Sequence, residues 1–311
     1  MISVIVPTRG RAHLLAGLVE AFDGDPQVLE IVVVVDGVDA SSMRVLDGLA
    51  SGGRRLVVLN PSRCGQLGAL DHGLARARGD VVLLLDDDVL PGPMLASGHA
   101  AYHREREGLV VVGSMPVRLS QNGRDPVGTR LYAEEYRGQC DRLERGEVDV
   151  LDSLWLGNVS LRRADGERVG LRSEGFPVFY HSDRDLGYRL ADAGMTGVYA
   201  PELRATHLHR RGMSAFLRDA QRQGAGREAL ARVHAARSNP VAPADPSGAI
   251  GGAAAAAVRL IGSTRLARPV ALGLMTAGGV SGRLGAPGLE VAAARSARRV
   301  MLRRGSVTGE E

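Results

Sequence analysis

The sequence lacks lysine altogether: all 39 basic residues in its 311 residues are arginine. This absence excludes Schiff-base chemistry and a P-loop, because both depend on a lysine side chain. Cysteine is also scarce. Cys64 and Cys140 lie far apart, with no CxxC or histidine-paired spacing, which excludes a disulfide-stapled small protein and indicates free thiols in a reducing compartment.

Long apolar runs are missing too. In the C-terminal part the longest uncharged stretches are 246–258 and 269–282, of 13 and 14 residues, whereas a helix that crosses a bilayer needs roughly 20. The chain enters a strand pattern at Met1 without the basic region and cleavable apolar run of a signal peptide. We therefore expect no transmembrane helix and a cytoplasmic location.

Positive charge is concentrated near the C-terminus. Residues 1–240 hold 30 arginines against 31 acidic residues, whereas residues 241–311 hold 9 arginines against 4. A nucleic-acid-binding domain would carry a basic surface of its own, and the main body of this chain is neutral. We expect no nucleic-acid partner.

Short β-rich runs alternate with helical patterns over the first hundred residues. Ile31–Val35 and Val81–Leu85 are apolar on both faces, which is typical of central strands covered by helices. The pattern predicts an open, mostly parallel α/β sheet with flanking helices. The predicted strands are 2–6, 30–35, 55–59, 81–85, 109–112 and 155–161, and the predicted helices are 12–22, 41–49, 65–78, 94–106, 182–193 and 214–237.

Three parts are expected along the chain. A large α/β domain covers 1–238 and includes a charged, irregular segment over 118–155. A proline-rich linker follows at 239–246. The remainder, 247–311, is a basic tail rich in alanine and glycine, with helical patterns over 253–261, 269–277 and 289–302.

The residues after each predicted strand carry the chemistry, since ligands of open α/β sheets bind outside the carboxyl ends of the strands. Three adjacent carboxylates would stay ionised there only with a cation to bind, and oxygen ligands suit Mg²⁺ or Mn²⁺. In an extended segment Asp86 and Asp88 face one cleft while Asp87 faces back into the fold. The alternative is that they cap the next turn. The strand-end residues are Pro7, Thr8 and Arg9, then Asp36, then Arg63, then Asp86, Asp87 and Asp88.

Several segments together resemble the family 2 glycosyltransferases, which have the GT-A fold. The resemblance covers about residues 1–215. Gly157–Arg163 is similar to the family's Gly-Asn-x-Ser-x-Arg-Arg stretch, and Ser182–Leu190 resembles its Glu-Asp-x-Asp-Leu-x-x-Arg-Leu motif. The N-terminal segments that match are Val4–Arg11, Val35–Asp36, Asn60–Gly79 with Gly65, Ala69 and Gly73, and Leu85–Pro91.

The resemblance implies an enzyme that moves a sugar from a nucleotide-diphosphate sugar to an acceptor hydroxyl with inversion. Residues 1–115 would form the nucleotide-sugar half and 116–238 the acceptor half. The acceptor would be a carbohydrate, a lipid-linked molecule or a small molecule, as in cell-envelope or glycoconjugate biosynthesis. The implied donor-binding residues are Pro7, Thr8, Arg9, Asp36, Arg63, Asp86 and Asp87.

The same resemblance assigns the reaction centre. Asp88 would bind Mg²⁺ or Mn²⁺, and Asp183 would be the general base. Independently, Asp183 begins a predicted helix, whose dipole favours the ionised carboxylate; the alternative is a first-turn acid without a catalytic part. On the acceptor side we expect Trp155, Asn158 and Asp185. Trp155 could instead be a core residue, and Asp185 could pair with Arg184 or Arg189.

Two features depart from the family pattern on the acceptor side. Ser182 stands where the family has an acid, and only Glu174–Phe176 partly matches its Gly-Gly-Phe-Asp turn. Farther along, His207 and His209 share one face of an extended segment, and we favour His207 as a metal ligand over a surface histidine. Arg210 and Arg211 could grip the pyrophosphate, or be solvated charges.

Two other classes remain as alternatives. A nicotinamide-dependent oxidoreductase shares the sheet pattern, but Pro7–Arg11 is not the Gly-x-Gly-x-x-Gly loop such enzymes use. A nucleotide-sugar-binding module without turnover would share the site but not need Asp183. The basic tail could bring the enzyme to the inner face of the cytoplasmic membrane as a peripheral contact, or serve as a helical lid or dimer contact.

Overall fold

The computed structural model describes residues 1–51, 56–176, 180–235, 237, 257–258, 260–283 and 287–309. The chain forms two compact units. The sheet unit comprises Met1–Arg118, Arg137–Ser173 and Asp183–His209, and the helical unit comprises Leu119–Tyr136, Glu174–Ser182 and Arg210–Glu311. The predicted linker at 239–246 lies outside the described residues, as does most of the predicted helix at 253–261, so the predicted domain boundaries stay a prediction.

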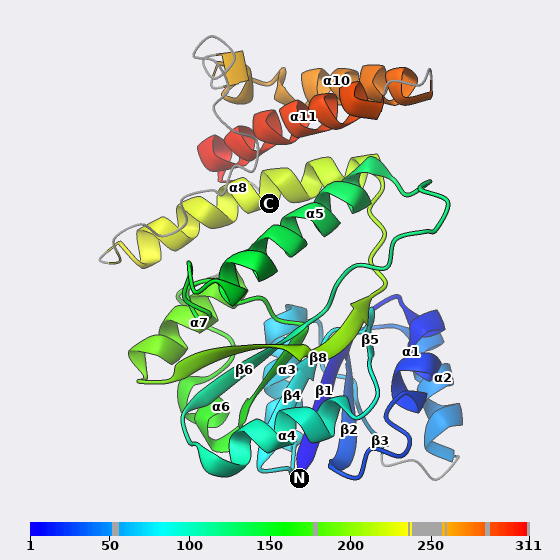
Figure 1. Cartoon of the computed structure of the whole chain (residues 1–311), viewed down its shortest axis with the longest axis vertical. Helices are drawn as coiled ribbons and strands as arrows, with labels where there is room; N and C mark the ends of the chain where they lie inside the picture. The colour runs from blue at the N-terminus through cyan, green and yellow to red at the C-terminus, as the bar shows by residue number, and fades with distance from the viewer. Residues whose placement is uncertain are drawn as a thin grey trace. The chain divides into compact units, whose positions relative to one another are not determined.

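Strands and helices alternate in the first half of the chain, as the sequence predicts (Figure 1). The first nine elements are β1 (Ile2–Thr8), α1 (Ala12–Glu20), β2 (Val28–Val35), α2 (Ala40–Ser51), β3 (Leu56–Leu59), α3 (Gly65–Arg76), β4 (Val81–Leu85), β5 (Val89–Pro91) and α4 (Leu95–Glu105). They are followed by β6 (Leu109–Ser114), α5 (Val127–Glu144), β7 (Asn158–Arg162), α6 (Arg163–Val169), α7 (Ser182–Asp192), β8 (Thr196–His207), α8 (Met213–Val233), α10 (Ala267–Arg283) and α11 (Pro287–Thr308).

The strands form one mixed sheet in the order β3-β2-β1-β4-β7-β6-β8-β5. This confirms the open α/β sheet. β1 pairs in parallel with β2 and β4, β2 with β3, and β6 with β8. β7 runs antiparallel to β4 and β6, and β5 antiparallel to β8. An apolar run reads the same in either direction, so the sequence pattern holds no signal for these reversals.

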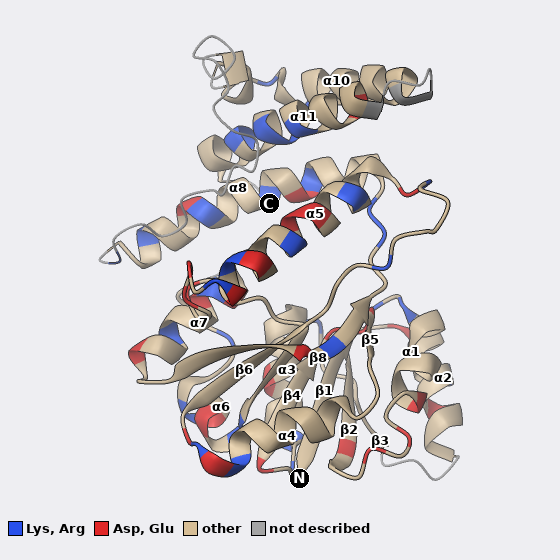
Figure 2. Cartoon of the chain, in the orientation of Figure 1, with Lys and Arg blue, Asp and Glu red and all other residues tan. Residues whose placement is uncertain are grey.

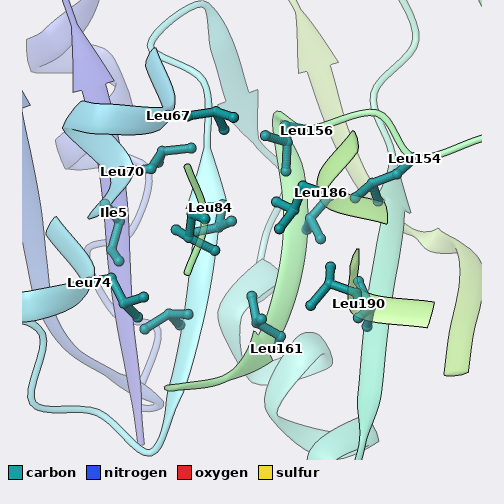
Figure 3. Packing of buried hydrophobic residues seen from close by; sticks show 14 of the residues in the cluster. Ile5, Leu67, Leu70, Leu74, Leu84, Leu154, Leu156, Leu161, Leu186 and Leu190 are labelled. Carbon is teal, nitrogen blue, oxygen red and sulfur yellow. The ribbon is translucent and has the colours of Figure 1, made fainter. Parts of the chain in front are cut away.

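One hydrophobic core of the sheet unit lies between the sheet and helices α3 and α7. Figure 3 shows Leu67, Leu70 and Leu74 of α3 beside Ile5 and Leu84, and Leu186 and Leu190 of α7 beside Leu156 and Leu161. α3 lies close to the sheet because Gly73 has no side chain: a Cβ there would come within 2.3 Å of Ile5 Cγ2. Burial of these aliphatic side chains, each contributing about 1.5–3 kcal/mol, fixes the strands that carry the site.

The segment 118–155, expected to be irregular, contains the 18-residue helix α5. Its sequence is dominated by polar and charged residues, so a core-facing stripe is hard to recognise. In the helical unit Leu131 of α5 packs with α8, α10 and α11. Glycines let α8 and α11 approach closely, because a Cβ at Gly305 would lie 1.7 Å from the Gln221 carbonyl oxygen.

Ion pairs also join the helices of this unit. Arg295 of α11 binds Glu134 of α5 at 2.7 Å, and Arg298 binds Glu135. Arg130 of α5 binds Glu290 of α11. Burial lowers the pKa of Arg298 to about 10. Some of the arginines of the C-terminal tail are therefore paired with acids inside the helical unit. Among the helices described, none is both long and apolar enough to cross a membrane.

Candidate active site

Three adjacent parallel strands end at the same edge of the sheet and bring the predicted donor-site residues together. β1 lies between β2 and β4, so Thr8 at the end of β1 lies near Asp36 and Asp86, which directly follow the two neighbouring strands. The Asp36 backbone N–H donates to the Thr8 carbonyl at 3.0 Å, and the Asp86 N–H to Gly157 at 3.3 Å. The carboxyl edge of the sheet is where this arrangement would bind a ligand.

Asp88 meets two histidines through strand pairing. β5 starts directly after Asp88 and pairs antiparallel with the end of β8, with Val89 opposite His207. The Leu208 N–H donates to the Asp88 carbonyl at 2.7 Å. As a result, Asp88 Oδ1 lies 3.3 Å from His207 Nε2, and Oδ2 lies 3.7 Å from His209 Nδ1.

Asp88, His207 and His209 form a candidate metal site. Each offers one ligand atom, and these atoms lie within 4.8 Å of one another. A carboxylate and two imidazoles are ligands that divalent transition metals bind. The sequence singled out Asp88 and His207; it noted that His209 shares the face of His207 but did not assign it, although that alternation was the signal for it.

The pKa of Asp88 is lowered in spite of its burial. Burial alone would raise its pKa, but the adjacent His207 and His209 side chains and the nearby charge of Arg11 outweigh it and hold the pKa well below its usual range. Asp86 behaves in the opposite way. Burial, reinforced by the negative charge of Asp88, raises the pKa of Asp86 to about 7, and Gln66 Nε2 donates to its Oδ1 at 2.7 Å.

Asp87 faces back toward β1, as predicted. Thr8 Oγ1 donates to Asp87 Oδ2 at 2.8 Å, and Arg11 donates to its Oδ1. Arg11 also contacts Asp88, with 3.2 Å from Nη2 to Oδ2. Sequence reasoning missed Arg11 and Gln66 as site residues. Each binds an aspartate more than 15 positions away in the chain, and a local sequence pattern does not predict such a contact.

Three of the residues predicted to bind the donor, Arg9, Asp36 and Arg63, lie together at the end of β2. Asp36 Oδ1 accepts the backbone N–H of Cys64 at 2.7 Å and of Gly65 at 3.3 Å, so this carboxylate caps the start of α3. Arg9 Nη1 reaches the Asp36 carbonyl at 3.4 Å. Arg63 lies against Gly37. Pro7 is buried in β1 opposite Val34. Their contacts with a donor stay a prediction.

Asp183 lies in the first turn of α7, where its Oδ1 accepts the Arg184 N–H at 2.9 Å. Burial raises the pKa of Asp183 to about 6, against the opposing charge of Arg184. The expectation that the helix dipole would lower this pKa is wrong, because burial outweighs the stabilisation of the charged form. Among the described residues, no hydrogen bond or ion pair joins Asp183 to Asp86, Asp87 or Asp88. The structure therefore describes a partly buried, weakly acidic carboxylate, and the base role stays a prediction.

Asp185 forms an ion pair with Arg189 within α7. Arg189 is one of the two partners, with Arg184, that the sequence suggested for Asp185. The Nε–Oδ2 distance is 3.0 Å and Asp185 is buried. Arg189 also donates to the carbonyls of residues 169, 170 and 171 at 3.1, 2.6 and 2.7 Å. These contacts describe a structural clamp on the segment after α6; an acceptor role for Asp185 stays a prediction.

Asn158 sits in a buried polar network behind the site. Its Nδ2 donates to the carbonyls of Ser114 and Leu203, and its Oδ1 lies 2.9 Å from His99 Nε2. Ser160 Oγ lies 2.8 Å from both His99 Nδ1 and His103 Nε2. Asn158 thus ties β7 to β6, β8 and α4.

Trp155, the other residue expected on the acceptor side, is half-buried between the buried Leu154 and Leu156. In the helical unit, Arg211 pairs with Asp219 at 3.0 Å and lies over the Tyr132 ring at 5.1 Å. Arg211 is therefore not a simply solvated charge, whereas Arg210 is exposed. The pyrophosphate roles of both arginines stay a prediction.

Comparisons with solved structures show the fold. The mannosyltransferase PcManGT from Pyrobaculum calidifontis, solved with GDP-Man and Mn²⁺, superposes with a TM-score of 0.60 and 18% identity, covering 100% of this chain and 88% of that one. GalNAc-T7, solved with UDP, GalNAc and Mn²⁺, gives a TM-score of 0.53 and 14% identity, covering 74% of this chain and 51% of that one. No curated protein sequence matches.

A family model settles the classification. The model of glycosyl transferase family 2 matches residues 3–164, more than half of the chain, from the first strand through β7. This range holds the strand-end residues Thr8 and Asp36 and the Asp86–Asp88 run. With the GT-A arrangement of its sheet, the chain belongs to glycosyl transferase family 2.

Proposed function

We propose that this glycosyltransferase moves a sugar from a nucleotide-diphosphate sugar to an acceptor hydroxyl with inversion, using a divalent metal at Asp88, His207 and His209. The observation that carries the proposal is this three-ligand cluster at the carboxyl edge of the sheet. Imidazole ligands favour Mn²⁺ over Mg²⁺, which prefers oxygen ligands throughout. The neighbours crystallised with Mn²⁺ support the same metal.

The residues around the cluster would hold the donor. Asp36, Arg9 and Arg63 lie together at the end of β2, where they would bind the nucleotide base and its sugar. Asp86 would contact the ribose, and Asp87, held by Thr8, would fix the loop that carries Asp88. When bound, the metal would offset negative charge on the departing diphosphate.

Asp183 would act as the general base. Its carboxylate would take the proton of an acceptor hydroxyl while that oxygen forms a bond to the anomeric carbon and the bond from this carbon to the diphosphate oxygen breaks. One displacement from the opposite face inverts the anomeric configuration. A pKa of about 6 suits a base that must be ionised near neutral pH yet accept a proton.

A thermal-shift screen of GDP-, UDP- and dTDP-sugars, with and without Mn²⁺, tests the proposal. We expect stabilisation by one nucleotide class that requires Mn²⁺ in the wild type and is lost in Asp88→Asn and His209→Gln. Metal-dependent stabilisation that persists in both variants would refute the metal site. Product formation with inverted configuration distinguishes the enzyme from a sugar-binding module, and stabilisation by NAD alone would favour an oxidoreductase.

We also propose that the helical unit contacts an anionic membrane surface and so presents a lipid-linked acceptor. The outer face of α10 has exposed Leu272 and Val280, and residues 269–282 carry no charge (Figure 2). Leu266 before the helix is 63% exposed, next to exposed Arg265. Apolar side chains flanked by arginine suit the interface of an anionic bilayer.

A further inference from the structure

Arg11 is a cation already placed against the candidate metal site. It immediately precedes α1 and its guanidinium binds two consecutive aspartates, Asp87 through Nη1 and Asp88 through Nη2. Both carboxylates are less than 10% exposed, whereas the Arg11 side chain is 42% exposed. Arg11 therefore covers the buried acids from the solvent side.

The contact with Asp88 involves the atom that matters for a metal. Asp88 Oδ2 lies 3.2 Å from Arg11 Nη2 and 3.7 Å from His209 Nδ1. The guanidinium and the second histidine thus approach the same carboxylate oxygen. A divalent ion bound to Asp88 and His209 would lie within a few ångströms of the guanidinium, and two cations so close repel strongly in a partly buried site.

We infer that Arg11 is a built-in counter-ion that competes with the divalent metal until a nucleoside diphosphate binds, so that metal and donor bind cooperatively. This inference rests on the metal site of the proposed function. Arg11 neutralises the two aspartates in the donor-free enzyme and weakens metal binding there. The incoming diphosphate supplies negative oxygens that the guanidinium fork can bind in pairs.

Two features lower the free-energy cost of moving Arg11 from the aspartates to a diphosphate. Its side chain is partly solvent-exposed, so it can rotate without leaving a cavity in the core. Asp87 keeps the hydrogen bond from Thr8 Oγ1 at 2.8 Å when Arg11 leaves, so the acid that does not belong to the metal cluster is still satisfied. Because the coupling is thermodynamic, metal must strengthen nucleotide binding by the factor by which nucleotide strengthens metal binding.

Mn²⁺ binding to the full chain, followed by electron paramagnetic resonance with and without GDP or UDP, tests this inference. In Arg11→Gln we expect the Kd for Mn²⁺ alone to fall about tenfold, as removal of a unit charge near the ion predicts. The gain in Mn²⁺ affinity on adding the nucleotide should shrink by a similar factor. Arg11→Lys should stay near the wild type for Mn²⁺ alone.

Arg104→Gln is the matched control, since Arg104 is exposed on α4 and its loss changes net charge equally. Circular dichroism melts verify that each variant folds. If folded Arg11→Gln binds Mn²⁺ alone no more tightly than the wild type, the counter-ion role is overturned while the metal site stands. If no protein binds Mn²⁺ even with nucleotide, the metal site itself is overturned, and with it the role of Arg11.

Discussion

At the scale of single residues, the sequence predicts acids better than their partners. Three successive aspartates at a strand end indicate a cation site by charge alone, and the structure places Asp88 with His207 and His209. Arg11 and Gln66 were out of reach, because only folding brings them to Asp88 and Asp86. The sequence suggested that Asp185 pairs with Arg184 or Arg189, and the structure has the pair with Arg189. The acceptor role of Asp185 stays a prediction.

Asp183→Asn should slow transfer by about 10²–10⁴ while leaving donor binding intact. An amide of nearly the same shape cannot take up the acceptor proton, and loss of a general base costs about 10²–10⁴ in rate. In the wild type, kcat/KM should fall as the pH drops below about 6, where Asp183 becomes protonated. Steady-state kinetics from pH 5 to 8 and nucleotide-sugar titrations of the variant measure both. Undiminished turnover in Asp183→Asn would assign the base elsewhere.

The buried histidines predict acid lability of the sheet unit. Burial lowers the pKa values of His99 and His103 to about 4, below the unfolded value near 6.5, so the unfolded state binds protons first as the pH falls. Between pH 7.5 and 4.5 we expect His103 to contribute a loss of about 2 kcal/mol in unfolding free energy. Urea unfolding of the wild type and His103→Gln at both pH values measures this.

The variant should show the smaller loss of stability on acidification. An equal loss in both proteins would mean that His103 does not titrate in this range. Asp86 and Asp183, whose pKa values are raised, act with the opposite sign and are common to both proteins, so the comparison cancels their contribution.

At the scale of elements, the strands buried on both faces and the polar helices α7 and α8 were predictable, whereas α5 was not. β1, β2 and β4 are apolar runs fully covered in the fold, and their boundaries differ from the predicted ones by at most two residues. α5 was missed because its sequence shows no clear apolar stripe. β8 was missed over most of its length since it alternates exposed and buried positions irregularly.

The clamp between α7 and the segment after α6 yields a prediction at this scale. Arg189→Met would leave the buried Asp185 carboxylate without its ion-pair partner and release three carbonyls. Breaking a buried pair by removing one partner costs about 3–5 kcal/mol. Arg168→Met is the control, because its pair with Asp165 is more exposed, at 53% and 19% of the two side chains, and such pairs contribute about 0–1 kcal/mol. Urea unfolding of both variants compares their free energies of unfolding. Equal losses of unfolding free energy would show that the Arg189 contacts do not stabilise the fold more than the Arg168 pair does.

At the scale of the whole molecule, the basic pI of about 9.5 describes the C-terminal part and not the site. Arg295 and Arg298 form ion pairs with Glu134 and Glu135 within the helical unit. The sequence count could not separate these structural arginines from surface ones, because the acids they bind lie about 160 positions away. The proposed membrane contact therefore depends on fewer charges than the composition suggests.

Co-sedimentation with liposomes containing phosphatidylglycerol tests the outer face of α10. We expect binding that weakens in Leu272→Asp/Val280→Asp and at high salt, since both apolar insertion and surface charge contribute. Val233→Asp on α8 is the control, as Val233 is also exposed. Equal sedimentation of both variants, or a concentration-dependent dimer without lipid binding, would favour a lid or self-association instead.

The pairing of β5 with β8 places Val89 opposite His207, so the aspartate and the two histidines come from parts of the chain more than 100 residues apart. A metal bound there would act as a reversible cross-link that closes a long loop, and its binding energy would add to folding stability. Chelation by EDTA should lower the melting temperature of wild-type protein in Mn²⁺ but not that of Asp88→Asn, measured by calorimetry. An equal melting temperature of the wild type with and without chelator would contradict it. The metal would then both take part in the reaction and hold the edge strand β5 against β8.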